Sequence, residues 1–160
     1  MTLFSLPSRV ACSVGLALLC AGPAAADTLV QRVALQTVDW PASSDEADAY
    51  LSSMFNPALL ASAEATELAA WAAYVLPGQA TRSALDHAGP EGIDAVLSGL
   101  VDGVRATEII GHHDVDDAAA LFGVLFHPAV IDAVAQAGGA REAAWSAMVD
   151  DVEALYPRAR

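Results

Sequence analysis

Two stretches of this chain repeat one another at an offset of 71 residues, and this repetition limits the folds that the chain can adopt. Ser44–Ser62 aligns without a gap with Val115–Ala133, and both contain the pattern F-x-P-A. A second matched pair, A-A-W-A-A-Y-V at Ala69–Val75 and A-A-W-S-A-M-V at Ala143–Val149, follows in the same order. Self-similarity of this kind is typical of repeated supersecondary units. We therefore predict two tandem, pseudo-symmetric copies of one unit, packed on each other.

Apolar residues in both copies recur at the spacing of an α-helix. They stand at Ala47, Tyr50, Leu51, Met54 and Phe55 in the first copy, and at Ala118, Leu121, Phe122, Leu125 and Phe126 in the second. This pattern of i, i+3, i+4, i+7 and i+8 is typical of a helix packed on one side. No stretch alternates with the two-residue period of a strand. We predict an all-α fold, a small helical bundle, in which Phe55 and Phe126 occupy equivalent buried sites.

Helix start signals divide each copy into four short helices. The first helix is predicted at 28–38 in the first copy and at 99–110 in the second. The second helix of the first copy begins at the sequence S-S-D-E, which is a capping box. In this motif Ser43 accepts a backbone N–H of the first turn and Glu46 reaches back toward the backbone before the helix. We therefore expect Ser43 to stabilise the helix start.

The third helix of each copy is predicted to begin at a proline. Pro57 and Pro128 suit the first helical position because their missing N–H would have no partner there. Asn56 precedes the first of them and is a good N-cap, whereas His127 precedes the second and is a poorer one. His127 is accordingly interpreted as a helix-start residue.

The domain organisation follows from these boundaries. Residues 27–160 are predicted to form one domain after a cleaved leader. Repeat one covers about 28–76 and repeat two about 99–157, and the linker between them, about 77–98, carries one helix at Ala80–His87.

The first 26 residues are typical of a secretory signal peptide. Arg9 supplies the positive charge, residues 10–21 form the apolar run, and small residues ending in Ala26 fit a cleavage site. We predict cleavage after Ala26 and a periplasmic or secreted protein. The apolar run is too short for a permanent anchor, so no stable membrane insertion of the mature chain is expected. Leu19 before Cys20 disfavours a lipoprotein, because lipidation at that cysteine requires a small preceding residue.

The charge and the cysteines restrict the class of protein. The formal net charge is −13, every basic residue is an arginine, and loss of Arg9 with the signal makes the charge one unit more negative. Such an acidic chain is not expected to bind nucleic acid or an anionic bilayer. Both cysteines lie within the predicted signal, so the mature chain has no disulfide and depends on its core.

The segment I-I-G-H-H-D-V-D-D, residues 109–117, combines two histidines with three aspartates. If one helix ran through it, Glu108, His112 and Asp116 would share a face. Together with His113 they could bind a divalent metal, zinc or manganese. The repeat supports a second interpretation, because it aligns this segment with the capping box of the first copy. The aspartates would then cap the helix and place negative charge at the positive end of its dipole. The histidines would face solvent or act as a pH sensor.

The three tryptophans are interpreted in two ways. Trp71 and Trp145 stand at equivalent places among small residues, so we predict that they anchor the core. Trp40 lies in a turn of the first copy and has no counterpart in the second. An exposed tryptophan there would be a candidate binding residue.

These observations favour an exported helical binding or interaction module with a protein or peptide partner, bound by an acidic or apolar face. A periplasmic divalent-metal-binding protein that uses the 108–117 segment is the alternative, and no other cofactor is expected. A small hydrolytic enzyme with a groove between the repeats is the third hypothesis. No catalytic residue is identified, because the chain lacks G-x-S-x-G and H-E-x-x-H motifs, and the adjacent Asp86 and His87 point apart on a helix.

Overall fold

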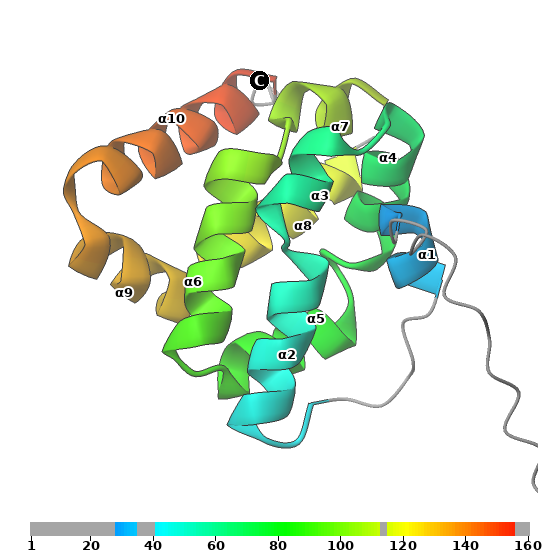
Figure 1. Ribbon diagram of the computed structural model, residues 1–160. Coiled ribbons are helices and arrows are strands. Elements are labelled where there is room, and N and C mark those ends of the chain that lie inside the picture. The colour runs from blue at the N-terminus through cyan, green and yellow to red at the C-terminus, as the bar shows by residue number, and fades with distance from the viewer. Residues whose placement is uncertain (1–27, 35–40, 113–114, 156–160) are drawn as a thin grey trace, which may run out of the picture.

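The computed structural model describes residues 28–34, 41–112 and 115–155, and the regular structure in these ranges is entirely helical. In chain order the elements are α1 (Leu29–Ala34), α2 (Ser44–Met54), α3 (Pro57–Ser62), α4 (Ala65–Tyr74), α5 (Gln79–His87), α6 (Pro90–Ser98), the π-helical turn η1 (Gly99–Gly103), α7 (Ala106–His112), α8 (Val115–Leu125), α9 (Pro128–Ala137) and α10 (Gly139–Leu155). In Figure 1, α6 lies between α9 and α10 on one side and α1, α4 and α7 on the other. The all-α prediction is confirmed.

Most of the predicted helix starts are confirmed. α3 begins at Pro57 and α9 at Pro128. The Asn56 side chain accepts the N–H groups of Ala58 and Leu59 at 3.0 and 3.2 Å, whereas His127 makes no capping bond. The helix predicted at Ala80–His87 is α5.

The first helix predicted for the second copy, at 99–110, is wrong. Residues 99–103 continue α6 as the π-helical turn η1, and α7 begins only at Ala106. Val104, with φ −80° and ψ 133°, is extended and separates the two. In the first copy the predicted helix at 28–38 corresponds to α1, and residues 35–38 lie outside the described ranges.

α6 has no counterpart among the helices expected from the sequence, although Pro90 at its first position is the same start signal as Pro57 and Pro128, and its cap comes from another helix. Gly89 is the N-cap of α6 and provides no side chain. Instead Asp48 of α2 accepts the N–H of Gly89 at 2.8 Å and that of Gly92 at 3.1 Å. Such a carboxylate at a helix N-terminus satisfies donors that would otherwise lack partners. A Cβ on Gly92 would lie 2.9 Å from the Cα of Asp48, so the glycine permits the approach of the two helices.

The core of the molecule surrounds Trp71 and Phe55, which are both fully buried. Their rings pack edge to face, with centroids 5.4 Å apart and planes inclined at 78°. The indole Nε1 of Trp71 donates to the backbone oxygen of Met54 at 2.8 Å, so its polar group is satisfied inside the core. The prediction that Trp71 is a core anchor is confirmed.

The prediction that Phe126 is buried like Phe55 is wrong. Phe126 is 45 % exposed, and Trp145, which packs against it, is only half-buried. The difference arises from the neighbouring helices, because Phe55 lies beneath the start of η1 at Gly99. No helix in the described ranges covers Phe126 in this way.

Two glycines allow η1 to pack directly on α3 and on the end of α2. A Cβ on Gly99 would overlap the carbonyl oxygen of Phe55, and one on Gly103 would lie 2.8 Å from the Cβ of Leu60. Gly99 and Gly103 are four residues apart and therefore share one side of the helical segment. This contact is one of the most extensive between any two elements of the fold.

No single helix in the described ranges is long and apolar enough to cross a membrane, although Ala118–Leu125 and Pro128–Ala137, bent by 58°, meet the length and composition limits as a pair.

We expect Gly99→Ala to lower the free energy of unfolding by about 1–3 kcal/mol, because the added methyl group overpacks the contact with Phe55. Urea denaturation measures the change. Gly123→Ala in α8 is the matched control, since a Cβ there meets nothing within 4 Å. It should raise the free energy of unfolding by about 0.5–1 kcal/mol through helix propensity. Equal effects of the two substitutions would contradict the role of Gly99.

The N-terminus of α2 has the expected cap. Ser43 Oγ accepts the N–H of Glu46 at 3.3 Å, and the Glu46 carboxylate accepts the N–H of Ala42 at 2.9 Å. The bond from the Ala42 backbone, followed by the bond from Ser43, lowers the pKa of Glu46 below its usual value. The stabilisation from this carboxylate is therefore present above its unfolded pKa and is lost as the pH falls through the folded pKa.

We expect Ser43→Ala to lower the free energy of unfolding by about 1 kcal/mol, because one N–H of the first turn loses its acceptor. Thermal and urea unfolding at neutral pH provide the measurement. Ser52→Ala, at an exposed position inside α2, is the control and should leave stability nearly unchanged. A Ser43 variant as stable as the original protein would show that the cap contributes nothing.

Candidate functional site

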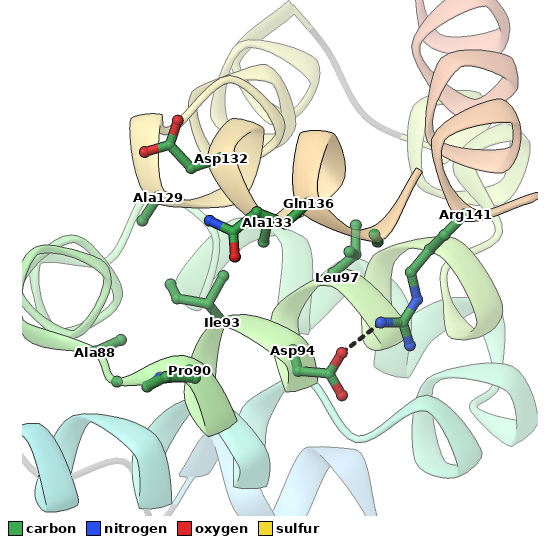
Figure 2. A pocket seen from close by; sticks show the side chains of 12 residues that line it. Ala88, Pro90, Ile93, Asp94, Leu97, Ala129, Asp132, Ala133, Gln136 and Arg141 are labelled. Atoms are coloured by element: carbon green, nitrogen blue, oxygen red, sulfur yellow. Dashed lines mark hydrogen bonds and ion pairs between the residues drawn. The ribbon is translucent and has the colours of Figure 1, made fainter. Parts of the chain in front are cut away.

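A groove of about 520 Å³ lies between α6 and α9, with α10 at one end. Figure 2 shows side chains from both helices facing into it. Its apolar lining includes Pro90, Ile93, Leu97, Ala129, Ala133 and Ala137, and its polar lining consists of Asp94, Asp132, Gln136 and Arg141. This volume falls in the range of roughly 300–1,000 Å³ that is usual for ligand sites.

The groove exists because α9 presents small side chains to α6. Ala129, Ala133 and Ala137 follow one another at four-residue intervals and lie on one side of α9. The larger Val130 and Val134 face the core instead and are buried. The alanines leave open space above Ile93 and Leu97 of α6, which form the apolar floor.

Arg141 closes the polar end of the groove. Its guanidinium forms an ion pair with Asp94, which Figure 2 marks, and it donates to Ser98 Oγ at 2.9 Å. Gly138 and Gly139 have φ values of 57° and 56° and make the turn that brings α10 back toward α6. Because both charged side chains are substantially exposed, the pair contributes orientation more than stability.

The groove combines an apolar floor with hydrogen-bonding groups at its edge. Asp94 and Asp132 provide carboxylates, Gln136 provides an amide, and Arg141 provides a guanidinium. This composition suits the binding of an apolar side chain with a polar or basic flank. The groove lies between the predicted linker and repeat two rather than between two repeats.

Two helices flank the predicted metal segment, and residues 113–114 between them lie outside the described residues. α7 ends at His112 and α8 begins at Val115, so Glu108 and Asp116 belong to different helices. The side chain of His112 and all of His113 lie outside the described residues. Among the side chains that the structure describes, no three histidine, aspartate or glutamate residues gather into a metal-binding group.

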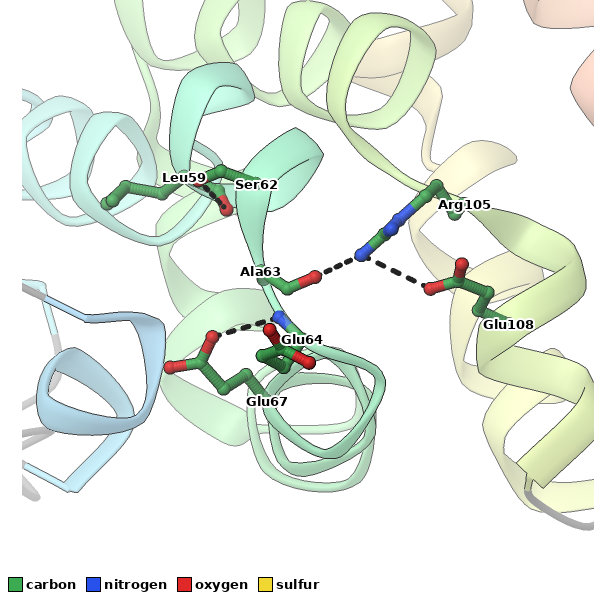
Figure 3. Close-up of polar contacts among 7 residues, drawn as sticks. All are labelled: Leu59, Ser62, Ala63, Glu64, Glu67, Arg105 and Glu108. Carbon is green, nitrogen blue, oxygen red and sulfur yellow. Dashed lines mark hydrogen bonds and ion pairs between the residues drawn. The ribbon is translucent and has the colours of Figure 1, made fainter.

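Glu108 already has a partner, as Figure 3 shows. The guanidinium of Arg105 lies 3.2 Å from Glu108 Oε2 and also donates to the backbone oxygen of Ala63. Arg105 thereby links α7 to the corner between α3 and α4. At that corner Glu64 donates its backbone N–H to Glu67 at 3.0 Å, in the capping box of α4. A metal bound by Glu108 would have to compete with Arg105.

The contact between His127 and Asp86 was not foreseen. His127 Nε2 lies 3.3 Å from Asp86 Oδ1, across 41 residues of sequence. The neighbour of Asp86, His87, turns its Nδ1 to the carbonyl oxygen of Ser83 at 2.8 Å, which agrees with the expectation that Asp86 and His87 do not pair. No local pattern could have revealed the contact between α5 and the start of α9. The predicted binding residue Trp40 lies outside the described residues.

No known family model, curated protein or solved structure matches this chain.

We expect native mass spectrometry of the protein to give a chain without a stoichiometric metal, because Glu108 is paired with Arg105 and no three ligand-type side chains gather among the described residues. Addition of equimolar zinc or manganese should not produce a saturable adduct. One metal per chain that disappears in the His112→Ala, His113→Ala variant would establish the metal site instead. Glu67→Ala serves as the control for nonspecific loss of metal at an acidic side chain.

Proposed function

We propose that this chain is an exported, all-helical binding module, and that the groove between α6 and α9 receives part of a protein or peptide partner. The observation that carries the proposal is the groove of about 520 Å³ itself, whose alanine and proline walls stand over the buried Ile93 and Leu97 and are edged by groups that can form hydrogen bonds. Binding sites for small ligands and peptide side chains combine these two features.

The charge of the chain indicates which charge its partner carries. With a net charge of −13 and two aspartates on the groove edge, the module favours a partner with apolar side chains flanked by basic ones. Complementary charge raises the rate of encounter and excludes acidic competitors.

We propose in addition that the binding domain consists of two tandem copies behind a cleaved signal peptide. Shared helix boundaries support the duplication, since α2 and α8 span residues 44–54 and 115–125 at the same offset. The ring pairs support it as well. Phe126 and Trp145 lie 5.6 Å apart at 79°, close to the geometry of the first-copy pair. The unequal burial of Phe55 and Phe126 limits the symmetry to the local arrangement of the helices.

The test of the groove uses a displayed library of random linear peptides selected against the intact mature protein. We expect the selected sequences to be apolar and basic, and the corresponding synthetic peptides to bind the original protein. Ala133→Trp should weaken binding by roughly tenfold or more, because the indole fills the groove. Fluorescence anisotropy of labelled peptides gives the affinities.

Ala135→Trp is the matched control, because Ala135 is exposed on the same helix and does not line the groove. It should leave peptide affinity unchanged. Circular dichroism establishes that both variants fold. Selected peptides that bind both tryptophan variants equally would show that the groove is not the site.

A further inference from the structure

The corner between α8 and α9 exposes two large apolar side chains. Phe126 is 45 % exposed and Ile131 is 41 % exposed. At the repeat offset of 71 residues their counterparts are Phe55 and Leu60, on the corner between α2 and α3. Both counterparts are fully buried, at 0 % exposure. The same pair of positions is thus covered at one corner and open at the other.

The two corners have the same backbone geometry. Phe55 donates its N–H to the oxygen of Leu51 at 2.8 Å, and Phe126 donates to the oxygen of Phe122 at 2.9 Å. The N-cap that follows has φ −68° and ψ 113° at the first corner, and φ −62° and ψ 134° at the second. In both cases a T-shaped ring contact connects the phenylalanine to the tryptophan of the fourth helix. The difference in exposure therefore comes from the surroundings of each corner.

The first corner is covered by a helical segment with two glycines. Gly99 lies against Phe55 and Gly103 lies against Leu60, and a Cβ at either position would crowd the corner. Because the glycines are four residues apart, α6 and η1 present one side without side chains and come close to the corner. The described part of the chain provides no such segment for Phe126 and Ile131.

We propose that the α8–α9 corner, defined by Phe126 and Ile131, is a docking surface for an α-helix of a basic partner protein. That helix covers the two side chains as α6 and η1 cover Phe55 and Leu60, with two small residues four positions apart at the contact. The corner is a different surface from the groove between α6 and α9.

The surface and the groove lie on different sides of α9. Ile131 precedes the groove residue Ala133 by two positions, which places them roughly 200° apart around the helix. A single side chain cannot occupy both, so the two surfaces can be blocked independently.

Charge determines the choice of occupant. Asp86, whose side chain is 66 % exposed, lies 3.3 Å from His127 at the corner itself, and Asp132, which lines the groove, is the sequence neighbour of Ile131 on α9. A second copy of this chain also carries a charge of −13 and would be repelled. A helix with basic residues at its edges complements both the two aspartates and the charge of the whole chain.

Trp145 provides a further sign that the packing at this corner is incomplete. Its Nε1 is buried and has no hydrogen-bond partner, whereas the Nε1 of the matching Trp71 donates to Met54. A buried N–H without an acceptor costs free energy, which a rearrangement of the corner on docking can recover. Trp145 fluorescence therefore provides a signal for occupancy of the surface.

The test uses a synthetic probe derived from the segment that covers the first corner. The probe is a stapled helical peptide of residues 90–104 in which Glu91, Asp94 and Asp102 are replaced by lysine. These three residues are exposed in the folded protein, so the replacements leave the glycine side of the peptide intact. We expect saturable binding to the intact mature protein, with a change in tryptophan fluorescence. The double variant Phe126→Gln, Ile131→Gln should weaken binding by roughly tenfold or more.

Leu155→Gln is the control for a nonspecific apolar contact, because Leu155 is 40 % exposed at the end of α10. It should leave the affinity unchanged. A second probe carries leucine in place of both glycines and should fail to bind, because the helix can no longer approach closely. This probe tests the proposal even if the double variant of the protein does not fold.

Four results obtained with the peptides or with the protein alone would overturn the proposal. They are the absence of saturable binding at millimolar peptide, binding that survives the double variant, binding that tolerates leucine at both glycines, and self-association through Phe126 measured by sedimentation.

Phosphatidylcholine vesicles distinguish a lipid surface from a protein helix. Partition of the protein into these vesicles that is lost in the double variant would assign the corner to membranes and reject the basic helix. The corner and the groove are different surfaces. A negative result with the stapled peptide would therefore not affect the peptide selection that tests the groove.

Discussion

The close approach of α6 and η1 to the corner between α2 and α3 is the contact on which the rest of the fold depends. It requires glycine at residues 99 and 103, since a Cβ at either place would crowd Phe55 or Leu60. The approach buries the Phe55–Trp71 pair, which forms the centre of the core. It also fixes α6 in the middle of the molecule, where its other side receives α9 and the start of α10. The groove is formed by that second contact.

The sequence was sufficient wherever the signal for an element is local. The caps at Ser43 and Asn56 and the prolines at Pro57 and Pro128 lie within a few residues of the helices that they start, and these helices begin where they were predicted. α6 differs, because its N-terminal N–H groups are satisfied by Asp48, about forty residues earlier in the chain. The cap from Asp48 leaves no pattern beside α6, and the one local signal for its start is Pro90 at the first helical position.

The candidate groove could not be predicted for a related reason. Ala129 and Ala133 lie beside the groove, whereas Ala47 and Ala118 are completely buried, yet nothing in the local sequence distinguishes the two pairs. The position of an alanine relative to the other helices decides whether it fills the core or leaves a space. The Arg141–Asp94 pair likewise joins residues 47 positions apart and depends on the turn at Gly138 and Gly139.

The exposure of Phe126 illustrates the difference between a pattern and its environment. The periodicity of α8 assigns Phe126 to the apolar side of the helix, and the ring contact with Trp145 agrees with that assignment. Periodicity defines which side of a helix is apolar, but burial also requires another element to lie on that side. The described part of the chain has two matching corners and one glycine-faced segment, so only one corner is covered. Two matching corners with a single covering segment among the described residues leave one apolar corner open, and an open apolar corner on an acidic chain is where a complementary helix would bind.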